Sequence, residues 1–279
     1  MFQNLFSEPT TEDLIKILKK SKFDESDANA ALEYVDINSV DNDGKTFLHH
    51  MCISNISEPI NWLVKNGINK EQEDYYDDTA LVLAVKNNSL KAFVKLLECG
   101  YDVDKQNRFG RTILQESLTF GDMNYFNKII KHTKNINSVD KNGRNILFDA
   151  VKNKNHTIIQ EVLASDIDKN LIDKEGNPAL LLPDIINDFE LLKIMIDGGV
   201  ETSLKDKDGN NLLYHLIKSE SINTDAIKYL ISKKIDVEKI LKKIQSTYST
   251  RGINLVCISN KWSFRTAKNL SNLMSKEKT

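Results

Sequence analysis

The sequence has few of the residues that build cross-linked or turn-rich proteins. Its 279 residues include three cysteines, four prolines and eleven glycines. The cysteines are odd in number, lie far apart and form no CxxC pair, which excludes a disulfide framework and a zinc ribbon and indicates a reducing compartment. So few glycines and prolines argue against an all-β architecture, which needs many turns.

Long apolar runs and an excess of charge of one sign are also missing. No window of about 18 uncharged apolar residues exists, so we expect no membrane span. The N-terminus lacks the basic and apolar regions of a signal peptide. The formal net charge is −2, so the chain as a whole is not a polycation that would coat nucleic acid. With 40% apolar residues it can bury a core, and we predict a soluble, cytoplasmic protein.

Five of the eleven glycines lie on one spacing of 33 residues. Asp77 occupies the one position on this spacing that lacks glycine. An internal period of this length indicates a solenoid. An Asp or Asn precedes each of these positions by three residues, and a leucine follows each by four. The glycines are Gly44, Gly110, Gly143, Gly176 and Gly209, and the leucines are Leu48, Leu81, Leu114, Leu147, Leu180 and Leu213.

Each of these recurring positions has a physical reason. Asp or Asn followed by Gly suits a tight turn, because the side chain bonds nearby backbone and glycine tolerates a positive φ. Thr, Asn or Pro then starts a helix at the leucine. We expect this first helix to end in a left-handed residue, before a second helix begins. The predicted left-handed residues are Asn55, Asn88, Gly121 and Asn187.

Residues 41–49 (DNDGKTFLH), 74–84 (DYYDDTALVLA) and 96–100 (LLECG) carry a resemblance to a known family. The pattern resembles the ankyrin repeat, with its consensus D-x-x-G-x-T-P-L-H-x-A and a second helix that ends L-L-x-x-G. The resemblance covers about residues 35–240. It implies an all-α ankyrin-repeat solenoid of helix-turn-helix units. One departure is Pro183 inside a first helix, where we expect the helix to bend or restart.

The domain organisation follows from the repeat. Residues 1–38 are predicted to form an N-terminal helical capping repeat, with helices over 10–20 and 26–34. Six ankyrin-like repeats then occupy residues 39–238. Residues 239–279 are predicted to form a basic helical C-terminal cap, because apolar segments recur around 237–245, 253–258 and 264–274.

Sequence motifs for catalysis are missing. There is no GxxxxGK[ST], HExxH or GxSxG, and exposed turns offer no deep pocket that would shift a pKa. His49 and Cys52 form an i, i+3 pair that could hold a metal, but the resemblance assigns His49 to the family's structural histidine, which ties adjacent turns together. We therefore predict no enzymatic activity, no cofactor, no metal and no small-molecule substrate.

The second and third turn tips differ from the others, because they carry aromatic residues and arginines. In the ankyrin family the tips and the exposed face of the first helix contact partners, and Tyr and Arg are enriched in binding hot spots. The alternative is that Tyr76 or Phe109 packs against a neighbouring tip. The predicted partner-binding residues are Tyr75, Tyr76, Asp78, Arg108, Phe109, Arg111, Phe120 and Arg144.

Charge is divided unevenly along the chain. Residues 239–279 hold nine Lys or Arg and one acidic residue, a net charge of +8 that leaves −10 for residues 1–238. Such a segment can bind nucleic acid or an acidic surface, neutralise the acidic repeats, or form a solvated face. The basic residues proposed for such a patch are Lys242, Lys243, Arg251, Lys261, Arg265 and Lys268.

Together these observations predict a monomeric, non-catalytic scaffold or adaptor that binds a partner protein through its concave face and turn tips. One alternative is a pathogen or viral ankyrin-type effector or inhibitor, which would sequester a host factor in the host cytosol. An alternative of another class is a nucleic-acid or acidic-surface binder that acts through the basic C-terminal segment.

Overall fold

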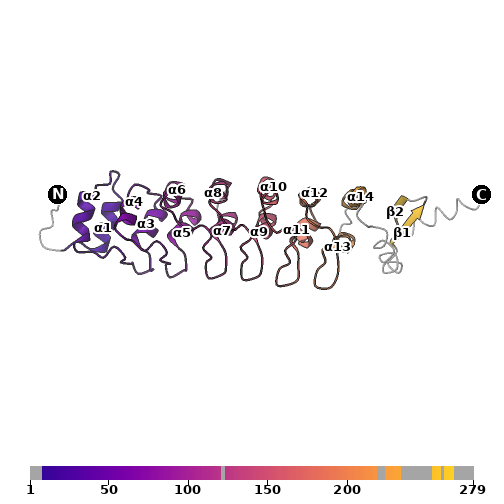
Figure 1. Ribbon diagram of the computed structural model, residues 1–279, viewed down its shortest axis with the longest axis horizontal. Helices are drawn as coiled ribbons and strands as arrows, with labels where there is room; N and C mark the ends of the chain where they lie inside the picture. The colour runs from indigo at the N-terminus through magenta and orange to yellow at the C-terminus, as the bar shows by residue number, and fades with distance from the viewer. Residues whose placement is uncertain (1–7, 121–122, 219–223, 234–252, 259–260, 267–279) are drawn as a thin grey trace, which may run out of the picture. The chain divides into compact units, whose positions relative to one another are not determined.

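A computed structural model describes residues 8–120, 123–218, 224–233, 253–258 and 261–266. The chain divides into two compact units, residues 1–174 and 175–279. In its described part the first unit contains ten helices, which form five consecutive pairs (Figure 1). They are α1 (Thr11–Leu18), α2 (Glu25–Leu32), α3 (Phe47–Ile53), α4 (Ile60–Lys65), α5 (Ala80–Lys86), α6 (Leu90–Glu98), α7 (Ile113–Phe120), α8 (Met123–Ile129), α9 (Ile146–Asn153) and α10 (His156–Ala164).

The helices begin where the repeat predicts helix starts. The Thr79 hydroxyl accepts a hydrogen bond from the Val82 N–H at 3.4 Å and so caps α5. Asn145 caps α9 in the same way, through the Leu147 N–H at 3.2 Å. These side chains satisfy backbone donors that have no partner within the helix. The predicted N-terminal helix pair is present as α1 and α2.

The left-handed helix ends are confirmed in two places. Asn55 and Asn88 both have φ of 53°. The prediction for Asn187 is wrong, since this residue has φ of −93° and a right-handed conformation. Lys154, which the pattern does not single out, ends α9 with φ of 58°. Gly121 lies outside the described residues.

The core of the first unit lies between its helices. The first helices of successive pairs contact one another, α3 with α5, α5 with α7, and α7 with α9. The recurring leucines Leu48, Leu81, Leu114 and Leu147 are at most 4% exposed. Burying one such side chain stabilises the fold by about 2 kcal/mol. The regular leucine position therefore provides each pair with a core contact.

The second unit holds the predicted fifth and sixth repeats. Its helical segments are η1 (Ala179–Leu181), α11 (Pro183–Ile186), α12 (Phe189–Asp197), α13 (Leu212–Lys218) and α14 (Thr224–Ser232). The prediction for Pro183 is confirmed, because a 3₁₀ turn ends at Leu181 and α11 restarts with the proline as its first residue. Proline has no N–H to donate, so it is tolerated at a helix start and not inside a helix.

The predicted C-terminal helices are wrong where the structure describes the chain. Residues 253–266 contain two antiparallel strands, β1 (Ile253–Ile258) and β2 (Lys261–Thr266), with Leu255 opposite Phe264. A six-residue apolar run does not distinguish a helix from a strand by periodicity, and β-branched and aromatic residues favour the strand. The predicted helices around 237–245 and beyond residue 266 lie outside the described residues.

Candidate protein-binding surface

The second and third turn tips border a groove of about 740 Å³ in the first unit. We call it the tip groove. Its walls come from the second turn (74–78), the third turn (107–111) and the C-terminal ends of α5, α7 and α9. The lining residues are Tyr76, Asp77, Asp78, Lys86, Asn107, Arg108, Phe109, Arg111, Glu116, Leu118, Thr119, Phe120, Asp149, Lys152 and Asn153.

Three aromatic side chains of the tip groove are exposed to solvent. The exposed fraction is 65% for Tyr76, 53% for Phe109 and 51% for Phe120. Tyr76 and Phe109 are thus not packed away against a neighbouring tip. The Arg108 guanidinium lies 4.7 Å from the centre of the Phe109 ring, and the Lys86 ammonium lies 5.1 Å from that of Phe120. Exposed apolar surface gathered in one place marks interaction sites.

Tyr75 lies at a different turn junction. Its ring covers Gly44 of the first turn, where an added Cβ would come within 2.6 Å of Tyr75 Cδ1. Tyr75 remains 71% exposed. It therefore extends the aromatic surface toward the first turn and is not a wall of the tip groove.

Arg111 is held in an ion-pair network beneath the groove. Its Nε donates to Glu116 Oε1 at 2.9 Å and its Nη1 to Asp149 Oδ1 at 3.0 Å. Its Nη2 donates to the carbonyl of Gln115 at 3.0 Å. Burial lowers the pKa of Arg111, but the two carboxylates outweigh this and raise it. Arg111 therefore positions α7 and α9 and is largely occupied within the fold.

Burial has the opposite result for one carboxylate of this network. The pKa of Asp149 is raised, because burial disfavours its charged form by more than Arg111 and Gln115 favour it. The Asp149 carboxylate depends on its two hydrogen-bonding partners, Arg111 at 3.0 Å and Gln115 at 3.2 Å. Removing either partner would leave a charge that is buried and poorly compensated.

The other predicted charged residues are also paired. Arg108 bonds Asp77 across the second and third turns, and Lys86 bonds Asp78 at 2.7 Å. Arg144 bonds Asp173 at 2.8 Å, and it is not among the residues that line the tip groove. The predicted site residues therefore divide into exposed aromatics and charged residues that hold the turns in place.

Sequence reasoning missed several walls of the groove. Lys86, Glu116, Asp149 and Lys152 come from the first helices of three repeats. A signal was available, because these walls recur at the same 33-residue spacing as the tips. One repeat position contains residues 86, 119 and 152, and the next contains residues 120 and 153. Extending the repeat from the tips to the last helical turn would have found Lys86 and Lys152.

The structural role predicted for His49 is confirmed. Its Nδ1 accepts a hydrogen bond from the Thr46 N–H at 2.9 Å, so its Nε2 carries the proton and donates to the Asp78 carbonyl at 3.0 Å. This links the first repeat to the second. Burial lowers the pKa of His49, because it disfavours the charged imidazolium. Among the described residues no group of three or more His, Cys, Asp and Glu could hold a metal ion.

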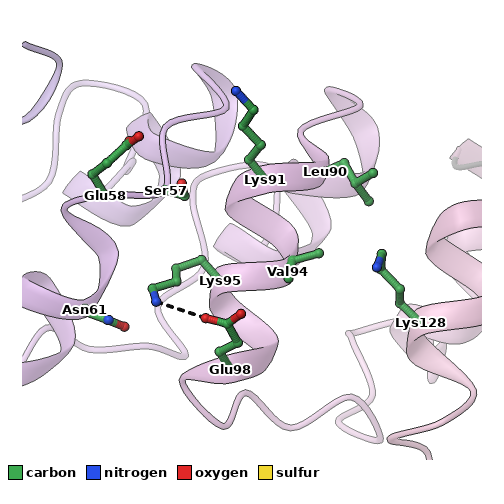
Figure 2. Close-up of a pocket in the computed structure, with 9 residues that line it drawn as sticks. All are labelled: Ser57, Glu58, Asn61, Leu90, Lys91, Val94, Lys95, Glu98 and Lys128. Carbon is green, nitrogen blue, oxygen red and sulfur yellow. Dashed lines mark hydrogen bonds and ion pairs between the residues drawn. The ribbon is translucent and has the colours of Figure 1, made fainter. Parts of the chain in front are cut away.

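A second hollow of about 700 Å³ lies over the second helices of the first unit. Figure 2 shows Lys91, Val94, Lys95 and Glu98 along one helix, with Lys95 paired to Glu98 at 2.9 Å. Seven of its nine lining residues are charged or polar. This hollow lacks the aromatic side chains that distinguish the tip groove.

The predicted basic patch falls mostly on residues without a described structure. Lys261 and Arg265 lie on β2, with Lys261 opposite Ile258 and Arg265 opposite Asn254. The remaining four, Lys242, Lys243, Arg251 and Lys268, lie outside the described residues. None of the described helices is both long enough and apolar enough to cross a membrane.

The comparisons with known proteins identify the family. The family model described as ankyrin repeats (3 copies) matches residues 10–107 and 81–173. The chain belongs to the ankyrin repeat family, with its all-α repeat fold. Ankyrin repeats generally mediate protein–protein interaction, and the family is generally non-catalytic. No curated protein matches the sequence.

Solved structures show the same fold at low sequence identity. The ankyrin repeat domain of Bcl-3, a member of the IkappaB protein family, is 21% identical, with a TM-score of 0.63, and the match covers 80% of this chain and 98% of that domain. The human ASB11 ankyrin repeat domain is 16% identical, with a TM-score of 0.58 and coverage of 72% and 91%. A chain from the complex of the Bdellovibrio bacteriovorus endopeptidase Bd0816 with the immunity protein Bd3460 is 19% identical, with a TM-score of 0.54 and coverage of 68% and 98%.

Proposed function

We propose that the chain is a monomeric, non-catalytic scaffold or adaptor of the cytoplasm that binds a partner protein through the tip groove. The observation that carries the proposal is the gathering of Tyr76, Phe109 and Phe120, each more than half exposed, on one groove. The family supports it, since ankyrin repeats generally mediate protein–protein interaction. Six repeats offer ample surface for an interface of roughly 1,600 Å².

The residues of the groove have different roles in this proposal. The three aromatic side chains are the anchors, because large rigid rings bury much area at low entropic cost. Arg108 and Lys86 lie over the Phe109 and Phe120 rings and hold them at the surface. Arg111 is a positioning residue, because it is bonded to Glu116 and Asp149.

An effector or inhibitor that sequesters a host factor would use the same surface. Its partner would come from a host, so the identity of the captured protein distinguishes it from an adaptor. The alternative of another class, binding of nucleic acid or an acidic surface, was placed on the basic C-terminal segment, and four of its six proposed basic residues lie outside the described residues.

The experiment compares the Tyr76→Ala, Phe109→Ala double variant with the wild type in affinity capture followed by mass spectrometry. We expect at least one protein captured by the wild type to be lost, because two anchors are removed. The thermal midpoint should change little, since exposed substitutions usually alter stability by less than about 0.5 kcal/mol each. Tyr34→Ala is the matched control, because Tyr34 is 56% exposed and lies outside the groove.

Two results would contradict the proposal. Unchanged capture by the double variant would show that the tips do not bind the partner. A large loss of stability in the double variant, with none in Tyr34→Ala, would show that Tyr76 and Phe109 support the fold.

A further inference from the structure

Successive turns of the first unit are joined by one recurring backbone hydrogen bond. The Tyr75 N–H donates to the Asp43 carbonyl, the Lys141 N–H to the Phe109 carbonyl, and the Lys174 N–H to the Asn142 carbonyl, each at 2.9 Å. In every case the acceptor is the residue directly before a glycine of the repeat. The equivalent bond between the second and third turns would run from the Arg108 N–H to the Tyr76 carbonyl. No backbone hydrogen bond joins these two described turns.

The glycines explain why the other turns can approach so closely. A Cβ built on Gly110 would lie 2.9 Å from the Lys141 nitrogen, and one on Gly44 would lie 3.0 Å from the Tyr75 nitrogen. A real Cβ at that distance would push the next turn away. Asp77 stands at this position of the second turn, with φ of 63° and a Cβ. Its carboxylate pairs with Arg108 across the junction.

The charges that face solvent around this junction are positive. In each ion pair of the groove the cation is the more exposed partner. The exposed side-chain fractions are 54% for Arg108 against 34% for Asp77, and 33% for Lys86 against 14% for Asp78. Lys152 is exposed and has no ion-pair partner among the described residues. An outer layer of cations over less exposed carboxylates favours an acidic ligand.

We propose that Asp77 holds the second and third turns apart, and that the opened groove takes an acidic peptide segment of a partner that also carries a large apolar side chain. The apolar side chain packs among Tyr76, Phe109 and Phe120, and a carboxylate of the segment pairs with Lys152 and Arg108. The Arg108 N–H, which has no backbone acceptor in the described part of the chain, donates to an oxygen of the segment. This inference rests on the proposed function and specifies its partner.

The test uses the full chain and two pools of short fluorescein-labelled peptides. One pool contains Glu, Leu, Phe and Gly at random positions, and the matched pool has Lys in place of Glu. Fluorescence anisotropy measures binding at low salt. We expect the Glu pool to bind at least about tenfold more tightly than the Lys pool, a difference of about 1.4 kcal/mol. Lys152→Glu should reduce this preference.

Two substitutions at Asp77 separate the spacing of the turns from the charge. Asp77→Gly removes the Cβ, so the turns can close as they do at Gly110. We expect exchange of the Arg108 amide hydrogen to slow about tenfold and affinity for the Glu pool to fall about tenfold. Asp77→Asn keeps the Cβ and releases Arg108 from its carboxylate. Exchange at Arg108 should stay fast, and affinity for the Glu pool should rise.

Each contrary result overturns a defined part of the proposal. Equal binding of the two pools, or no binding of either, would overturn the proposal that the partner segment is acidic. Unchanged amide exchange in Asp77→Gly would overturn the role of Asp77 in separating the turns. If the Arg108 amide hydrogen exchanges more slowly in Asp77→Gly but affinity for the Glu pool does not change, the peptide does not bind between the second and third turns. If these tests fail while the Tyr76, Phe109 double variant still loses its captured partner, the proposed function stands and only the partner chemistry is wrong.

Discussion

The junction between the second and third turns and the junction between the third and fourth turns are built from the same 33-residue repeat, yet they differ in one contact. At the third–fourth junction Gly110 lets the Lys141 N–H reach the Phe109 carbonyl at 2.9 Å. At the second–third junction Asp77 replaces glycine, and the turns are bridged by the ion pair of Asp77 with Arg108. At these two described junctions, the backbone hydrogen bond is present where the repeat has glycine and absent where it has Asp77.

The two junctions also differ in what covers them. Tyr76 and Phe109 stand exposed on either side of the second–third junction. Of the other junctions in the first unit, the first–second one is covered by the ring of Tyr75 over Gly44. Exposed aromatics therefore lie at both of these junctions, but at the second–third junction they border turns that no backbone hydrogen bond joins among the described residues. The following predictions alter this contrast, beginning with the largest expected effect.

Arg111→Ala should remove the support beneath the open junction. It leaves the buried carboxylates of Glu116 and Asp149 without their cation. Breaking a fully buried pair by removing one partner costs about 3–5 kcal/mol, and we expect a somewhat smaller loss here because the Arg111 side chain is 19% exposed. Urea unfolding should show this loss. Lys86→Ala is the control, because the Lys86–Asp78 pair is more exposed and such pairs contribute only about 0–1 kcal/mol. Equal losses in the two variants would refute a special role for the Arg111 network.

Gly110→Ala should push the third and fourth turns apart, so that their junction resembles the one between the second and third turns. Gly110 has φ of 74°, and the new Cβ would meet the Lys141 backbone. Gly67→Ala is the matched control, since Gly67 has φ of 82° and nothing within 4 Å of an added Cβ. The control should lose about 1–2 kcal/mol from left-handed strain, and Gly110→Ala about 1–3 kcal/mol more from the clash. Equal chemical-denaturation midpoints in the two variants would mean that the turns are not closely packed.

His49 should make the link between the first and second repeats sensitive to pH. Its pKa is lowered by burial, so the unfolded chain takes up a proton before the folded one does. The contribution of neutral His49 to the free energy of unfolding is fully present above its pKa in the unfolded chain, about 6.5. It is lost as the pH falls below that value, by up to about 1.4 kcal/mol per pH unit. His50 also has a pKa lowered by burial, so the measurement is the difference in pH slope between wild type and His49→Asn. Parallel slopes would contradict the prediction.

Lys152→Ala should have the smallest effect on stability. Lys152 is exposed and has no ion-pair partner among the described residues, so the free energy of unfolding should change by less than about 0.5 kcal/mol. Thermal unfolding at low and moderate salt checks this. A loss of several degrees in the midpoint would show that Lys152 supports the fold and is not available to a ligand.

The fold was largely predictable because its signals are local. Turn, helix start and core leucine recur every 33 residues, and each acts within a few residues of its own position. The C-terminal strands were not predictable from periodicity, because six-residue segments such as Ile253–Ile258 are too short to distinguish the helical period of 3.6 residues from the strand period of 2 residues. The replacement of the recurring glycine by Asp77 was visible in the sequence, but the lack of a backbone hydrogen bond between the described second and third turns was not.

The candidate site was predictable in part. Tyr76, Phe109 and Phe120 were found from composition and register, and the structure places all three on one groove. Arg111 was predicted as a contact residue, but its guanidinium lies with Glu116 of its own repeat and Asp149 of the next. Such a choice of partner depends on distances between repeats, which a single sequence does not contain.

Amide hydrogen exchange in the wild-type chain, followed by NMR, tests most directly whether the second–third junction is open. The donors to compare are the equivalent N–H groups of Tyr75, Arg108, Lys141 and Lys174. We predict that the Arg108 amide exchanges at least about tenfold faster than the other three, because it alone among these four lacks the bond to the preceding turn. An Arg108 amide as protected as that of Lys141 would contradict the account.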